Sequence, residues 1–424
     1  MDDIRISYNS IRYIIFMVVL YIYIYNPPFA GLPLMPIELL LLFSLAYLTV
    51  FNKWFKILSI FEIEVVIFFL IVSFCFIREL FGFGNVFFRV NIFFFLQTIV
   101  IPYFIVNLYS KITTHNNLLK DIVDTGFIAA LFTLIMLFVP VLDEVIRYKI
   151  LKTDDFTELV AYRAFGLSEG LTFAYGTTQG LVFGLALFYA KKNPIYYLYL
   201  PIILLSIIFN ARIGLVPVVF SLLYFVFIQF NIKLISIISL FSLVLYVIIF
   251  KTSLFAEYTK TIEWAFDFFI QSSDFLTGNS NGSANTFDTL FGDMAVLPNG
   301  IQEWLFGTGE NIFLASSGNS DIGYLIQLNY GGITYLVLLF TLIGYMMYRL
   351  KFLYQIDRWL IFLFLTTIVI TNIKGLMISI IPSFRLIAII YCYLIMENRL
   401  FKKNKLEDFS LLQLSNPKSI SSNA

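Results

Sequence analysis

The sequence predicts an all-α integral membrane protein, and three observations support this. Hydrophobic residues make up 60% of the 424-residue chain and charged residues 13%, against roughly 45–50% and 25% in soluble domains. Apolar stretches of about 17–25 residues, enough to cross about 30 Å of hydrocarbon as a helix, recur along the chain. They are continuously apolar rather than alternating. This favours helices over a barrel, because backbone in lipid must satisfy its own hydrogen bonds.

The chain is expected to form a single polytopic domain, residues 1–424. Its candidate membrane spans are twelve, at residues 13–25, 37–51, 58–77, 90–109, 124–141, 171–190, 195–209, 213–230, 234–250, 330–348, 359–373 and 383–398. Arg5 and Arg12 precede the first span, and no small-residue cleavage site follows it. The first span is therefore expected to stay in the protein.

Basic residues in the connections predict the orientation, because Lys and Arg are retained on the cytoplasmic side. With the N-terminus inside, cytoplasmic segments hold 17 of the 28 Lys and Arg residues. Both termini are then cytoplasmic, including a basic tail at residues 399–424. The formal net charge of +1 gives no ground for a nucleic-acid partner.

Two segments predicted to be external, residues 142–170 and 251–329, are too long for simple turns. The second holds two lysines and nine carboxylates, which give it a net charge of −7. Within it, residues 254–270 place aromatic side chains among charges at roughly helical spacing. This spacing suits a helix lying on the membrane interface and, equally, a helix packed on a core of the loop itself.

Arginines return repeatedly to the predicted external boundary, where ionisable groups are costly and each is a functional candidate. Arg212, for example, lies in "FNARIG", a turn of about three residues that has no need of arginine. Any one of them could simply extend to lipid phosphate. As a group they suit the diphosphate of a membrane lipid, because guanidinium binds phosphate oxygens with two donors. The candidate diphosphate-binding residues are Arg78, Arg89, Arg163, Arg212 and Arg385.

Two carboxylates are candidate catalytic residues. Glu169 follows Arg163 by six residues in "YRAFGLSEG", and Asp321 precedes the span that begins near residue 330. Either carboxylate could act as the general base that takes a proton from a sugar hydroxyl. Each could equally be a helix-capping acid, which is favourable at a helix start.

Other kinds of chemistry find little support in the sequence. Cys75 and Cys392 lie inside apolar runs and are expected to be buried thiols. The single histidine, His115, falls in a predicted cytoplasmic loop, and no paired-acid motif for a metal is present. "GFGN" and "GTGEN" lack the lysine of a phosphate-binding loop. We therefore expect no metal and no cofactor.

Three motifs together carry a resemblance to a known family. "YRAFGLSEG" precedes a span, "FNARIG" separates the next two, and the large loop closes with "WLFGTGEN" and "NSDIGYLIQLNYGGI". In this order and topology the chain resembles the O-antigen polymerase (Wzy) family, within the O-antigen polymerase and ligase superfamily. The resemblance implies a membrane-embedded glycosyltransferase of GT-C-like architecture in the bacterial inner membrane.

The resemblance also implies the reaction. Such enzymes act on the periplasmic side and move a growing glycan from undecaprenyl diphosphate to the terminal sugar of an incoming lipid-linked repeat unit. Arg163 and Arg212 match the external-loop arginines of the family, and Arg385 matches a basic residue near its last span. The implied partners are the lipid-linked donor and acceptor, membrane lipid and a chain-length regulator protein.

Two alternatives remain. Ligases that attach O-antigen to lipid A-core are similar in layout but usually carry a histidine in the large loop, and residues 251–329 contain none. Polymerase is therefore preferred. A flippase or transporter of the same lipid is the other alternative. It predicts charges along a path at mid-bilayer, whereas here they lie at span ends and in loops.

Overall fold

We describe the protein from a computed structural model of the chain. The structure describes residues 2–81, 87–112, 117–151, 163–169, 173–228, 294–313, 320–353, 358–379 and 381–415, with single residues at 236, 247 and 292. The span predicted at 234–250, most of the loop predicted at 251–329, the interfacial helix predicted at 254–270 and His115 lie outside these residues, apart from the short described pieces.

All the named elements in the described part of the chain are helical. They are α1 (Asp2–Tyr25), α2 (Pro36–Val50), α3 (Trp54–Ile60), α4 (Glu62–Leu80), α5 (Phe87–Phe95), η1 (Leu96–Val100), α6 (Ile101–Ile112), α7 (Leu118–Phe138), α8 (Pro140–Glu144), η2 (Val145–Ile150), α10 (Phe173–Ala190), η3 (Pro194–Leu198), α11 (Tyr199–Ile208), η4 (Arg212–Gly214), α12 (Leu215–Leu223), η5 (Tyr224–Ile228), α16 (Ile301–Phe306), α17 (Gly323–Lys351), α18 (Arg358–Thr371) and α19 (Pro382–Ser415). The all-α prediction is confirmed.

Three of the described helical segments are long and apolar enough to cross a membrane: Phe87–Ile112, Leu118–Phe138 and Gly323–Lys351. A fourth span is possible from α2 and α3, which meet at a bend of 101°. Apolar helices of 10–17 residues occur at four further places in the described chain. These helices suit a protein embedded in a membrane. The number of twelve spans stays a prediction.

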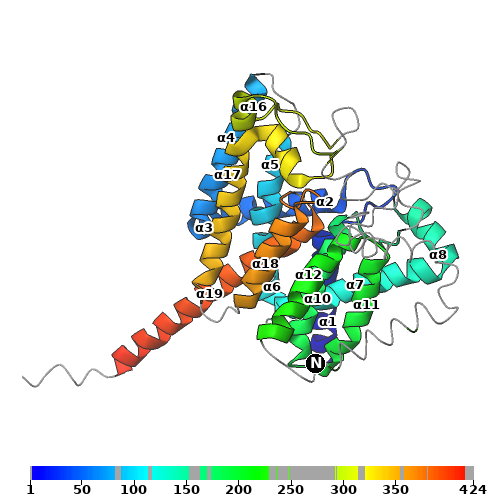
Figure 1. Cartoon of the computed structure of the whole chain (residues 1–424). Coiled ribbons are helices and arrows are strands. Elements are labelled where there is room, and N and C mark those ends of the chain that lie inside the picture. The colour runs from blue at the N-terminus through cyan, green and yellow to red at the C-terminus, as the bar shows by residue number, and fades with distance from the viewer. Residues whose placement is uncertain are drawn as a thin grey trace, which may run out of the picture.

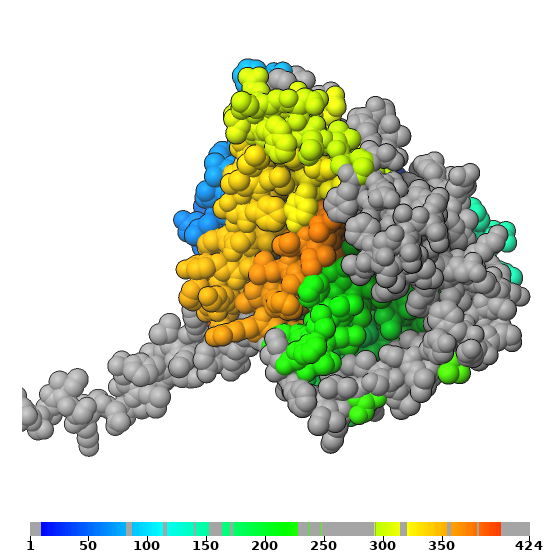
Figure 2. Space-filling view, viewed as in Figure 1, coloured from blue at the N-terminus to red at the C-terminus, as the bar shows by residue number. Residues whose placement is uncertain are grey.

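The helices are arranged so that the start of α1 and the outer part of α19 lie on one side (Figure 1). The N-terminus and the outer part of α19 lie at the lower end of the view, and α16 lies at the opposite end. We call the lower end the tail side. Figure 2 shows the residues of α16 covering the top of the column that α17 forms. α19 runs unbroken through residue 398 to Ser415, so the first part of the predicted tail is helical.

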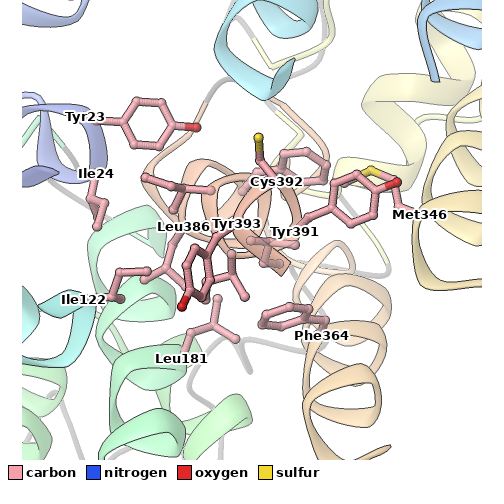
Figure 3. Close-up of a cluster of buried hydrophobic side chains, with 14 of the residues drawn as sticks. Tyr23, Ile24, Ile122, Leu181, Met346, Phe364, Leu386, Tyr391, Cys392 and Tyr393 are labelled. Carbon is pink, nitrogen blue, oxygen red and sulfur yellow. The ribbon is translucent and has the colours of Figure 1, made fainter. Parts of the chain in front are cut away.

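The core is built around α19. Residues 386–392 of this helix are each 0% exposed, as expected for a helix that is apolar on all sides and enclosed by others. Figure 3 shows the side chains of α19 surrounded by side chains of α1, α7, α10, α17 and α18. The surrounding residues labelled there are, in the same order, Tyr23, Ile122, Leu181, Met346 and Phe364. Arg385, in the first turn of the same helix, is likewise buried.

Four helices begin at least three residues before the predicted spans: α1, α5, α7 and α17. α7 begins at Leu118 rather than 124, and the side chain of Asn117 caps it by accepting a hydrogen bond from the amide of Lys120. Its first turns are polar, yet Asp121 is buried because the hydroxyls of Tyr13 and Tyr109 each donate to it over 2.6 Å. A hydropathy pattern leaves such polar turns out of a predicted span, although other parts of the fold supply hydrogen-bond partners for their polar groups.

α17 begins at Gly323 rather than 330, and Gly332 divides it with φ +67° and ψ −169°. A Cβ at Gly332 would collide with the backbone of Leu305 and Phe306 at the end of α16. A Cβ at Gly307 would likewise collide with the backbone of residues 329–331. The amide of Thr308 donates to the carbonyl of Asn329 over 2.6 Å. The glycines of "WLFGTGEN" and "NYGGI" therefore allow two backbones to touch.

Gly332→Ala is expected to destabilise the protein by about 1–3 kcal/mol, because alanine strongly disfavours this backbone conformation and the opposing atoms are backbone. Gly344→Ala is the matched control on the same helix, where an added Cβ meets nothing within 4 Å. Thermal unfolding of the detergent-solubilised variants measures both. Equal melting temperatures for the two variants would contradict this account of the kink.

The segment predicted as a loop at 142–170 is partly helical. α8 and η2 continue from α7 to residue 150. Leu151 then pairs with Phe29 in an isolated antiparallel bridge, and the amide of Ala30 donates to the carbonyl of Ile150 over 2.7 Å. This attachment fixes the segment against the connection that follows α1.

Candidate functional site

Residues 163–169, which carry "RAFGLSE", are held in place from three directions. The side chain of Arg147 donates to the carbonyl of Arg163 over 2.7 Å, and its guanidinium lies 5.2 Å from the centre of the Phe165 ring. From α1, the hydroxyl of Tyr21 donates to the carbonyl of Leu167 over 2.8 Å. Arg147 is itself paired with Asp143. The chain therefore presents Arg163 from a fixed backbone.

The third attachment joins two of the motifs found in the sequence. The amide of Ala164 donates to the carbonyl of Phe209 over 3.0 Å, and the side-chain amide of Asn210 donates to the carbonyl of Ala164 over 3.1 Å. "YRAFGLSEG" and "FNARIG" are thus hydrogen-bonded neighbours. Asn210 is 0% exposed, so its amide serves this contact rather than solvent.

Glycines bring the turn that carries Arg212 against α10. A Cβ at Gly176 would lie 2.8 Å from the carbonyl oxygen of Ala211. Gly180 and Gly214 make similarly close approaches across the same pair of segments. The position of the Arg212 turn is therefore set by backbone contact with α10.

The start of α17 and the connection between α18 and α19 form a second contact beside α10. The amide of Tyr324 donates to the carbonyl of Asn372 over 3.2 Å, and the side chain of Asn372 donates to Gln327 over 3.1 Å. Gly375, at φ +126°, lies against the ring of Phe173 at the start of α10. This contact places Asp321 and Lys374 on the side where α10 begins.

Two arginines and one carboxylate act electrostatically on Lys374 at this place. Burial lowers the pKa of the Lys374 ammonium, the positive charges of Arg212 and Arg163 lower it further, and the carboxylate of Asp321 opposes them. All four side chains are partly exposed. They come from residues 163–169, 209–214, 320–323 and 372–379, and we call these four segments the loop face. An excess of positive charge on partly exposed groups suits a multiply charged anion.

Glu169, which is 22% exposed, forms an ion pair with the buried Arg385. Arg385 is 2% exposed and donates from one terminal nitrogen to Oε1 of Glu169. Oε2 of Glu169 accepts from the side-chain amide of Asn26, which accepts in turn from the amide of Ile37 over 2.9 Å. The amide of Glu169 donates to the carbonyl of Tyr25 over 2.9 Å. Both carboxylate oxygens are therefore engaged.

The structure places the two remaining predicted arginines in other surroundings. Arg78 is buried, donates to the carbonyl of Gly307 over 3.3 Å and lies 5.9 Å from the centre of the Phe74 ring. Arg89 is exposed, with its guanidinium 5.6 Å from the centre of the Phe93 ring. Of the five candidate arginines, Arg163 and Arg212 are the pair whose charges meet at Lys374.

Sequence reasoning missed two contributors to this region and left a third, Lys374, out of the diphosphate-binding set. Asn26 follows the first span in a turn and gives no sign of its contact with Glu169. Arg147 falls in a segment predicted to be a loop. Lys374 was recognisable as an external basic residue, but only the fold shows its proximity to Arg212. Within the described residues, no three His, Cys, Asp or Glu side chains gather closely enough to hold a metal ion.

The lowered pKa of Lys374 predicts a pH-dependent difference in stability. The charged ammonium of Lys374 destabilises the folded protein, and this destabilisation is fully present at pH values below the pKa that Lys374 has in the folded state. It disappears as pH rises from there toward the unfolded value near 10.4. Lys374→Gln removes this destabilisation. We expect the variant to melt above wild type at neutral pH, with the gap narrowing as pH rises. A gap independent of pH between 7 and 10 would contradict this.

The apolar helices define an all-α protein suited to a membrane. The charges of the loop face give it a cationic site at the ends of several helices. Searches with family models, among curated proteins and among solved structures found no match to the chain.

Proposed function

We propose that the protein is a membrane-embedded glycosyltransferase that polymerises lipid-linked oligosaccharide repeat units. The observation that carries the proposal is the meeting of Arg163, Arg212, Lys374 and Asp321 at the loop face. These residues come from segments far apart in the sequence. Partly burying several like charges near one another is energetically unfavourable, and such groups are commonly functional.

A lipid diphosphate fits this group by charge and by place. Cleavage of a sugar–diphosphate bond develops negative charge on the leaving diphosphate. Arg163, Arg212 and Lys374 would stabilise that charge because they are positioned before the reaction. The apolar helices around the site suit the lipid tail. The proposed donor is a glycan on undecaprenyl diphosphate, and the proposed membrane is the bacterial inner membrane with the loop face periplasmic.

We assign the general base to Asp321 rather than Glu169. Asp321 is partly exposed and interacts with the cation of Lys374, so an acceptor hydroxyl can reach it next to the donor's diphosphate. Glu169 is held by Arg385 and Asn26, and we give this pair the task of positioning residues 163–169. Asp321→Asn should then lower the rate about 10²–10⁴-fold, the range of general-base catalysis.

Arg78 and Arg89 are left out of the proposed site. The guanidinium of Arg78 supports the contact between α16 and α17 through Gly307, which is a structural role. Arg89 lies on a ring at an exposed position, as an arginine at a lipid boundary commonly does.

The test is an assay of the purified protein with a lipid-linked repeat unit, followed by separation of the products by length. Products of two or more repeats still attached to undecaprenyl diphosphate support the proposal. Transfer of preformed polymer to lipid A-core without lengthening would indicate a ligase instead. Movement of labelled substrate across vesicles without lengthening would indicate a flippase.

A further inference from the structure

A cavity of about 440 Å³ opens at the tail side, on the opposite side of the molecule from the proposed glycosyltransferase site. Three parts of the chain form it: the end of α3 at Ser59 and Ile60, the end of α17 with the residues after it, and α19 at residues 395–399. Its volume is in the range of small-molecule sites, about 300–1,000 Å³.

Two guanidiniums line this cavity from different helices. Arg349 is held on the inner side, where it pairs with the buried Glu64 and donates to the carbonyl of Ile60 over 2.8 Å. Arg399 is exposed and reaches across to α3, where it donates to the carbonyl of Ser59 over 3.3 Å and to its hydroxyl over 3.4 Å. Because Glu64 offsets the charge of Arg349, the net charge of the cavity is that of Arg399.

Most of the remaining lining is apolar, and part of it is exposed on the surface of the protein. Tyr348 is 59% exposed and Phe352 is 64% exposed, and Leu353 and Ile395 complete the wall. Two such exposed aromatic side chains at the end of a long apolar helix are typical of the boundary between lipid and water. A phospholipid could contact a guanidinium here with its phosphate and the apolar wall with its acyl chains.

The sequence beyond the cavity supports the same class of ligand. After Arg399, α19 continues with Lys402, Lys403 and Lys405. Four or more basic residues directly after a membrane helix attract anionic lipids. We propose that the cavity binds the phosphate headgroup of one anionic phospholipid, with Arg399 as its principal donor. Asn398 and Ser59 supply further polar groups in the lining.

Native mass spectrometry of the full-length protein in detergent tests this with phosphatidylglycerol, phosphatidylcholine and glycerol 3-phosphate. We expect one phosphatidylglycerol to be retained at least about fivefold more tightly than phosphatidylcholine. Arg399→Gln should weaken this binding about tenfold, the size of one charge-assisted hydrogen bond. Arg399→Lys should be intermediate, because it keeps the charge but loses the two-pronged donor.

Lys56→Gln is the matched control, because it removes a positive charge from an exposed position on α3, three residues before Ser59, and Lys56 is not among the described residues that line the cavity. It should leave the affinity within about twofold of wild type. Equal losses in Arg399→Gln and Lys56→Gln would overturn the proposal in favour of general surface attraction. Equal binding of the two lipids, or competition by glycerol 3-phosphate as effective as by the lipid, would also overturn it.

Discussion

Arg212→Ala is expected to lower the rate of glycan transfer about 10²–10³-fold, the loss typical when one preorganised donor to a developing charge is removed. The reason is its position. Arg212 lies in a turn held against α10 by close backbone contacts of Gly176 and Gly214, so the guanidinium is directed by the fold. The charges of Arg212 and Arg163 both act on Lys374, and we propose that a diphosphate bridges all three cations.

The measurement is the polymerisation assay, with thermal unfolding as the control for folding. The backbone contacts of the turn do not depend on the side chain, so we expect the melting temperature to stay near that of wild type. Arg212→Lys should recover only part of the rate, because an ammonium lacks the planar fork of guanidinium.

Arg89→Ala distinguishes two versions of the diphosphate site. The version from the sequence includes Arg89, and the version from the structure leaves it out. The sequence groups Arg89 with Arg212 as an external arginine, whereas the structure places it on the ring of Phe93. We expect its rate to stay within about threefold of wild type, as is usual for exposed substitutions. A loss as large as that of Arg212→Ala would contradict the narrower site.

The fold class follows from the sequence because one physical constraint dominates it. Backbone in lipid must be helical or closed, so long apolar runs leave few choices. Helix limits are harder to predict, since they depend on partners. The start of α7 is polar in sequence, yet Tyr13 and Tyr109 satisfy Asp121 there. Likewise, Gly332 divides α17 only because α16 lies against it.

The candidate site could be predicted only in part. Arg163 and Arg212 stand out because charge is rare at span ends, and the structure brings their motifs together through Ala164 and Asn210. The partner of Glu169 could not be found in this way. Asn26 is an ordinary turn residue, and its contact with Glu169 spans 143 positions of the sequence. Such pairs are set by how helices pack.

The second large effect concerns stability. Arg349→Met is expected to destabilise the protein by about 3 kcal/mol, because breaking a buried pair leaves an uncompensated charge. Glu64 is 0% exposed, and it accepts from Arg349 and from the hydroxyl of Tyr391. The side chain of Arg349 is 25% exposed, so it reaches water at the cavity when its partner is lost.

This difference in exposure makes the effect asymmetric and therefore testable. Glu64→Gln should cost less than Arg349→Met, since glutamine still accepts a hydrogen bond and the stranded guanidinium can be hydrated. The double variant Glu64→Gln, Arg349→Met should recover most of the loss, because no buried charge remains. Thermal unfolding of the four proteins in one detergent measures this. Strictly additive losses would show that Glu64 and Arg349 stabilise the helix ends independently, against the pairing between them.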